Sequence, residues 1–149
     1  RLQFDDYFFE ANKAKLLGNY GKAVEYLLQC NSIEANNATV AFMLAEIYYQ
    51  KRVLADAEKW AQISVNQDAK NKWFLELLAK IQTDAYKFKQ AAESYQKLCD
   101  LDPKEIDHYI NWANVLIKDK KVEEAIKVFD LAEQRLGISD ETTGNKEYL

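Results

Sequence analysis

Helix-breaking residues are scarce in this chain, which has four glycines and one proline among 149 residues. Alanine, leucine, lysine, glutamate and glutamine, which all favour helices, are abundant. With 48% hydrophobic residues, a chain of this length can bury a real core and has the size of one domain. The composition therefore predicts an all-α protein.

An excess of positive charge and long apolar runs are also missing. The net charge is −4 and the pI is near 5.1, whereas nucleic-acid-binding proteins depend on clustered lysine and arginine. No run of 18 apolar residues is present, so no membrane-spanning helix is expected. The sequence thus predicts a soluble chain without a nucleic-acid partner, and it does not determine the compartment.

Cysteine occurs twice, at Cys30 and Cys99, which lie two repeat lengths and one position apart in the repeat pattern described below. A disulfide needs Cα atoms within about 7 Å, and neighbouring helices pack about 8–10 Å apart. We therefore expect no bridge between them and interpret both as small buried side chains.

The residue patterns of catalytic and cofactor sites are absent as well. His108 is the only histidine, and it is expected on the surface or in a groove rather than as a general base. No Cys/His cluster has metal-ligand spacing, and no glycine-rich loop could hold a phosphate. Adjacent carboxylates such as Glu123 and Glu124 point in different directions on a helix. The sequence predicts no enzyme activity, no cofactor and no metal.

Alanine recurs with a period of 34 residues (57 − 23 = 34). Two sets of alanines and one set of bulky residues recur at this spacing, and we call each set a column. They are Ala23, Ala57, Ala91 and Ala125; Ala11, Ala45, Ala79 and Ala113; and Tyr20, Leu54, Phe88 and Val122. Such a period indicates stacked helical hairpins that share one core, with small residues where the backbones approach closely. The phase divides the array into residues 4–37, 38–71, 72–105 and 106–139. Residues 140–149 are either a tail or the start of a fifth repeat, and the sequence favours the fifth repeat.

Each unit shows apolar residues at i, i+3, i+4 and i+7, which predicts a helix A and a helix B. The expected helices are 4–17 and 20–33, 38–51 and 54–67, 72–84 and 87–100, and 103–118 and 122–136. Gly18-Asn19 is expected to stop the first helix, and Asn37 and Asn71 to cap the next two A helices. The last A helix is expected to start after Asp102, with Pro103 in its first position.

These units resemble the tetratricopeptide repeat (TPR) family. The matching positions are Tyr7, Glu10, Ala11, Ala14, Ala23, Leu27 and Ala35; Ala41, Leu44, Ala45, Tyr48, Ala57, Ala61 and Ala69; Leu75, Leu78, Ala79, Gln82, Ala91, Tyr95 and Pro103; and Tyr109, Trp112, Ala113, Leu116, Ala125, Phe129 and Gly137. The resemblance covers residues 4–139 and implies a right-handed superhelix of four hairpins. The opening FDDYFFEANKAKLLGNYGKA also looks like the start of long arrays in Bacteroidetes-type bacteria. With the start at Arg1 rather than Met, this predicts a fragment of a bacterial multi-repeat array, from the cytoplasm or the periplasm.

In the family, A helices line a concave groove that holds extended peptides or helices. The resemblance implies that the groove residues of this chain are Phe8, Asn12, Lys15, Thr39, Phe42, Glu46, Tyr49, Trp73, Glu76, Lys80, Thr83, Ile110, Asn114 and Ile117. Phe42, Tyr49 and Trp73 are candidate aromatic anchors for a protein or peptide partner. The alternative for Phe42 and Trp73 is that they only cover gaps between hairpins.

Some family members clamp a C-terminal carboxylate with lysine, asparagine and arginine at set groove positions. In this chain Asn12 matches one of those positions, and the others hold Phe8, Met43, Trp73 and Leu77. If the clamp positions are counted from the second unit instead, they hold no cationic residues either. A carboxylate clamp is therefore not expected. RNA-reading repeats of 35 residues are disfavoured by the acidic pI and the period of 34.

A second hypothesis treats the array as a structural spacer of a longer repeat protein. The final helix, 122–136, carries apolar residues such as Val128, Phe129 and Leu131, and no polar capping helix follows it. Arrays of this kind need a capping element for solubility. The sequence therefore predicts either end-to-end self-association or coverage of this helix by residues 140–149.

Overall fold

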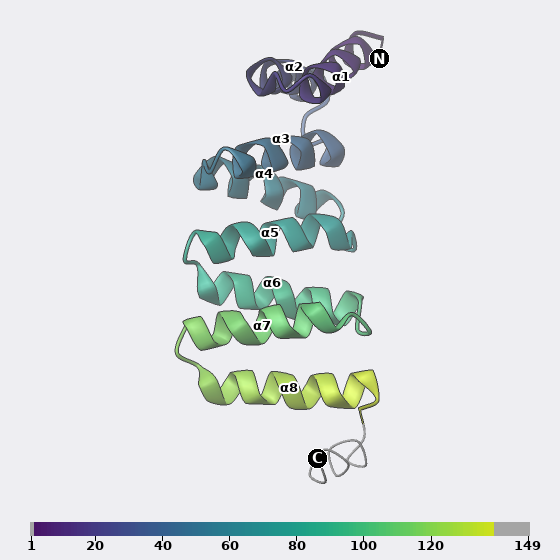
Figure 1. Ribbon diagram of the computed structural model, residues 1–149. Helices are drawn as coiled ribbons and strands as arrows, with labels where there is room; N and C mark the ends of the chain where they lie inside the picture. Colours follow the sequence, from purple (N-terminus) through teal and green to yellow (C-terminus); the bar gives the residue numbers. More distant parts are fainter. Residues whose placement is uncertain (1, 139–149) are drawn as a thin grey trace. The chain divides into compact units, whose positions relative to one another are not determined.

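The computed structural model describes residues 2–138, apart from the side chain of Leu2, and all its regular elements are α-helices. They are α1 (Leu2–Leu16), α2 (Tyr20–Ile33), α3 (Ala38–Gln50), α4 (Leu54–Gln67), α5 (Lys72–Asp84), α6 (Phe88–Leu101), α7 (Ile106–Lys118) and α8 (Val122–Leu136) (Figure 1). The predicted all-α class and the alternation of A and B helices are confirmed. The expectations for residues 140–149 fall outside the described residues.

The helices fall into two compact units, a first unit that ends at Ala85 and a second unit that begins at Tyr86. In the first unit α1 packs on α2, α3 packs on α4, and α4 packs on α5, while α3 also touches both α2 and α5. In the second unit α7 packs against both α6 and α8. The division into four repeats over residues 4–139 stays a prediction.

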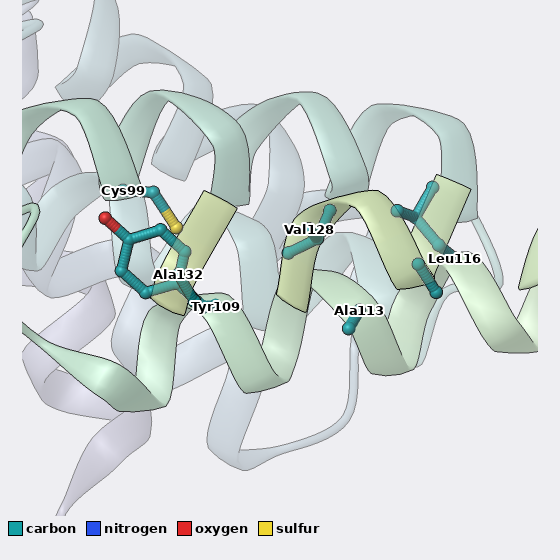
Figure 2. Close-up of a cluster of buried hydrophobic side chains, with 7 residues drawn as sticks. Cys99, Tyr109, Ala113, Leu116, Val128 and Ala132 are labelled. Atoms are coloured by element: carbon teal, nitrogen blue, oxygen red, sulfur yellow. The ribbon is translucent and has the colours of Figure 1, made fainter. Parts of the chain in front are cut away.

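Both alanine columns lie in the core. All eight of their alanines are at most 1% exposed. Because a methyl group needs little space, the helices can approach closely at these points. In the second unit Ala113 belongs to a buried cluster in which Tyr109 lies beside Cys99 and Ala132 (Figure 2). Both cysteines are free thiols and fully buried, as predicted.

The turn from helix A to helix B places one residue in the left-handed region at the same repeat position every time. These residues are Gly18 (φ 77°), Arg52 (φ 62°), Tyr86 (φ 59°) and Lys120 (φ 61°). The amide after this residue reaches back to the helix: the Lys121 N–H donates to the Leu116 carbonyl at 2.8 Å. This bond is typical of a Schellman motif. Gly18 therefore ends α1 as predicted.

Asparagine caps open two A helices, as predicted. The side chain of Asn37 accepts from the Val40 N–H at 3.1 Å, and that of Asn71 accepts from the Phe74 N–H at 3.1 Å. Each bond satisfies an amide that has no partner inside its own helix.

The predicted start of the last A helix at Asp102-Pro103 is wrong. Helix α7 begins at Ile106, and Glu105 is its cap, with the Asp107 N–H donating to the Glu105 side chain at 3.4 Å. Asp102 instead ends α6, where its N–H donates to the Leu98 carbonyl at 2.9 Å. Glu105 follows Asn71 by one repeat period, so the stacking phase places the cap. Proline is compatible with a turn as well as with a first helical position, and Pro103 lies in the turn.

Candidate functional site

Eleven predicted groove residues lie on the A helices of the first unit, and we call their surface the A-helix face. They are Phe8, Asn12 and Lys15 on α1, Thr39, Phe42, Glu46 and Tyr49 on α3, and Trp73, Glu76, Lys80 and Thr83 on α5. None of the eleven is buried. Because α3 touches α5 and Lys15 reaches Glu46, side chains of all three helices come together on this face.

The aromatic side chains on this face differ in exposure. Phe42 is half-buried and packs on Phe74 of α5, with ring centroids 4.8 Å apart and an interplanar angle of 35°. Trp73, the neighbour of Phe74 in sequence, is 65% exposed. The ammonium of Lys72 lies 5.0 Å from the centroid of the Trp73 ring. Phe42 thus covers the gap between α3 and α5, whereas Trp73 presents its ring to solvent.

Tyr49 lies in a polar contact that the sequence did not indicate. Its hydroxyl donates to Asp84 Oδ2 at 2.6 Å, and Arg52 Nη1 lies 2.7 Å from the same oxygen. The Arg52 guanidinium also lies 5.4 Å from the centroid of the Tyr49 ring. Burial, and after it the neighbouring Asp84 carboxylate, raises the pKa of Tyr49, because both disfavour the phenolate. Tyr49 is therefore held at the end of α5 rather than pointing freely into solvent.

Charged side chains of both signs surround the aromatic rings. Lys15 Nζ lies 3.6 Å from Glu46 Oε1 and joins α1 to α3. Lys80 Nζ lies 2.9 Å from Glu76 Oε1 within α5. Exposed pairs of this kind contribute only about 0.2–1 kcal/mol each, so they can exchange partners at little cost. They give the face a mixed-charge rim.

The α1 end of the face is partly satisfied within its own helix. Asn12 Nδ2 donates to the Phe8 carbonyl at 2.8 Å. The Phe8 ring stacks on Phe4, with centroids 5.9 Å apart. Asn12, the one residue that matches a carboxylate-clamp position, therefore already uses a donor inside α1.

The remaining predicted groove residues lie on α7 in the second unit. Ile110, Asn114 and Ile117 are all exposed there. They occupy the same repeat positions on α7 that Phe42, Glu46 and Tyr49 occupy on α3.

His108 is not on the surface, contrary to expectation. It is 6% exposed, and its Nε2 lies 3.3 Å from Asp102 Oδ2. The next residue, Tyr109, is fully buried and donates its hydroxyl to the Pro103 carbonyl at 2.8 Å. Because α7 starts at Ile106 rather than at Pro103, the 102–105 turn folds over this first helical turn and covers His108.

Within residues 2–138, no group of three or more His, Cys, Asp or Glu side chains is placed to hold a metal ion. In the same part of the chain, no helix has the length and apolar character needed to cross a membrane.

Comparisons with known proteins identify the repeat. A family model described as "Tetratricopeptide repeat" matches residues 7–37. No curated protein sequence matches the chain. The solved structure "MamA AMB-1" superposes with a TM-score of 0.80 at 19% identity, over 88% of this chain and 72% of that chain. This chain has the tetratricopeptide repeat fold.

Other TPR structures are similar at the same level. A tetratricopeptide repeat protein from Parabacteroides merdae gives a TM-score of 0.79 at 18% identity, over 93% of this chain and 56% of that chain. "First TPR of Spaghetti (RPAP3) bound to HSP90 peptide SRMEEVD" gives 0.68 at 15% identity, over 76% of this chain and 90% of that chain. At these identities the likeness shows the fold alone, and TPR domains generally mediate protein–protein interaction.

Proposed function

We propose that this protein is a non-catalytic TPR scaffold that binds a protein or peptide partner on the A-helix face. The observation that supports it is the 65% exposed indole of Trp73. Its backbone is fixed because the next residue, Phe74, is buried against Phe42. An aromatic ring on a rigid helix loses little entropy on binding, which is the character of an interface hot spot.

The charged side chains of the A-helix face suggest the chemistry of the partner. The ion pairs Lys15–Glu46 and Lys80–Glu76 form a rim that contains both signs of charge. Such a rim suits a peptide with an apolar or aromatic anchor and flanking charges of both signs. A C-terminal carboxylate is a poor fit, because Met43 is buried and Trp73 and Leu77 carry no charge.

A peptide selection tests this proposal. Peptides selected from a random library on the wild-type chain are measured against Trp73→Ala and against the triple variant Phe42→Ala, Tyr49→Ala, Trp73→Ala. Truncating a hot spot costs about 2 kcal/mol or more, so we expect at least about thirtyfold weaker binding to Trp73→Ala. The matched control is Phe9→Ala, since Phe9 is an aromatic residue of the same unit with 67% exposure and lies outside this face. Equal affinity of the folded triple variant and the wild type would refute the proposal.

A second candidate function is the spacer hypothesis, in which the chain is a segment of a longer bacterial repeat array. The supporting observation is the exposed stripe Val122, Ile126 and Phe129 on α8. Phe129 is 42% exposed, whereas Leu27, at the same repeat position in the first unit, is fully buried. Stacked repeats bury this position against the next hairpin, so we propose self-association through α8.

Light scattering over a range of concentrations tests the second candidate. Self-association that is lost in Ile126→Lys but kept in Lys97→Glu, an exposed position on α6, would support it. A wild-type chain that stays monomeric at every concentration would exclude it.

A further inference from the structure

A pocket of about 410 Å³ lies in the second unit. It opens between α6 and α8, and its lining includes Ala92 of α6, Trp112 and Leu116 of α7, and Val128 and Leu131 of α8. Trp112 is only partly buried, although it packs against the core cluster of the second unit. Leu116 and Val128 belong to this cluster (Figure 2). The volume of the pocket is in the range of ligand pockets, and the floor of the pocket is apolar.

The first unit shows what fits into such a groove. Two repeat periods before Val128, the equivalent residue is Trp60 on α4, and two periods before Trp112 it is Leu44 on α3. Trp60 is 8% exposed, so in the first unit an indole from the B helix is enclosed by the protein. In the second unit the indole belongs to the A helix instead. Valine is much smaller than tryptophan, so the position that carries a ring in the first unit leaves space in the second.

A lysine accompanies this position in both units. Lys59 Nζ lies 5.0 Å from the centroid of the Trp60 ring, a distance at which an ammonium attracts the face of an indole. Lys127, two periods later, lines the pocket beside Val128. The second unit therefore has the cation of this pair but no aromatic ring of its own at position 128.

The positive and negative charges on the rim of the pocket balance. Lys89, Lys121 and Lys127 line it together with Glu93, Asp119 and Glu124, and Lys121 Nζ lies 3.4 Å from Asp119 Oδ2. This balance favours an uncharged group over an ionic one. The carboxylates are acceptors for an indole N–H, which usually needs a hydrogen-bond partner when it is buried.

We propose that this pocket binds an aromatic side chain of a partner polypeptide, an indole above all. The ring takes the place that Trp60 has in the first unit. It rests on Trp112 and is covered by Lys127. This pocket lies in the second unit, whereas the A-helix face lies in the first unit.

NMR titration of the full chain with N-acetyl-L-tryptophanamide tests the proposal. In the protein without probe, Trp112 and Trp73 give separate indole N–H signals. We expect a saturable shift of the Trp112 signal at millimolar probe, as suits a small ligand, and no shift of Trp73. N-acetyl-L-leucinamide, which has no ring, should bind at least fivefold more weakly. No saturable shift, or equal binding of both probes, would overturn the proposal.

Two variants locate the site. Val128→Trp fills the pocket as Trp60 does, and it should abolish binding and raise the melting temperature. Lys127→Gln lies on the surface, should fold normally, and should weaken binding at least fivefold, whereas the control Lys97→Gln on α6 should not. Unchanged affinity of the folded Lys127→Gln chain would overturn the assignment even where Val128→Trp fails to fold. A Trp112 signal that changes with protein concentration in the absence of the probe would show that a second copy of this chain fills the pocket. That result would overturn the proposal of a separate partner.

Discussion

At two pairs of equivalent repeat positions, the first unit has a buried indole on a B helix, whereas the second unit has a partly buried indole on an A helix. In the first unit Leu44 lies on the A helix and Trp60 on the B helix, whereas in the second unit Trp112 lies on the A helix and Val128 on the B helix. The alanines at the close-approach positions do not change between the units and are buried in both. The comparison shows that the fold depends on where small residues stand. The large residues can be exchanged between helices, and each exchange gives the unit a different surface.

The same comparison separates the two proposed sites. The first unit buries Trp60 of the B helix α4 and carries an exposed aromatic residue, Trp73, on the A helix α5. The second unit exposes aliphatic residues such as Ile110 on its A helix and has its pocket between its B helices. The two proposed sites therefore use different helices of the repeat.

Truncation of the equivalent B-helix residues should have the largest effect. Trp60→Ala removes a nearly buried indole and should lower the free energy of unfolding by about 3–5 kcal/mol. Val128→Ala removes two methyl-sized groups beside an existing pocket and should cost about 1.5 kcal/mol. Urea unfolding of each variant measures the difference. Equal losses would mean that Trp60 does not fill its groove more completely than Val128 does.

The two buried cysteines should make the protein sensitive to alkali. Burial raises the pKa of Cys99 from 9.0 to about 12, and it raises the pKa of Cys30 as well. Because the folded state holds the proton more tightly, this contribution to stability is complete below pH 9 and is lost as the pH rises towards 12. We expect Cys99 to account for a loss of about 1.4 kcal/mol between pH 7 and pH 10.

Urea unfolding of wild type and Cys99→Ala at pH 7 and pH 10 isolates the contribution of Cys99 to the free energy of unfolding, because lysines and tyrosines titrate in both proteins. The variant should lose less stability than the wild type. An identical loss in both would contradict the assignment to Cys99.

The left-handed turn position should give the smallest effect. Gly18 and Lys120 stand at equivalent positions with φ of 77° and 61°. A Cβ built on Gly18 meets no atom within 4 Å, so Gly18→Ala tests backbone strain alone and should cost about 1 kcal/mol. Lys120→Gly should stabilise the second unit by up to about 1 kcal/mol. Thermal unfolding measures both changes, and shifts of the same sign would show that the two turns are not equivalent.

Local sequence signals predicted the helices well where the repeat phase supported them. Asn37 and Asn71 cap their helices as expected, and Gly18 ends the first helix. The error at Asp102-Pro103 arose because a strong local motif was preferred to the phase, which marks Glu105 as the equivalent of Asn71. The expectation that His108 lies on the surface or in a groove is also wrong, because the structure buries it beside Asp102.

The candidate site could be predicted only as a set of positions. The period assigned Phe42, Tyr49 and Trp73 to one helix face, but it did not indicate which of them would be covered. Tyr49 donates to Asp84, 35 residues away, and Arg52 joins the same carboxylate. No spacing rule predicts such a contact, because it depends on side chains that meet across helices.

By itself, the sequence determined the helical class, the hairpin unit and the buried alanine columns, since these follow from a strict period of small and apolar residues. Only the tertiary structure decided which aromatic rings are exposed and where a pocket remains open. Exposure of Trp73, coverage of Phe42 and the space beside Val128 all depend on the volumes of side chains from neighbouring helices. Packing adds those volumes across the repeat, and a periodic pattern records only their positions.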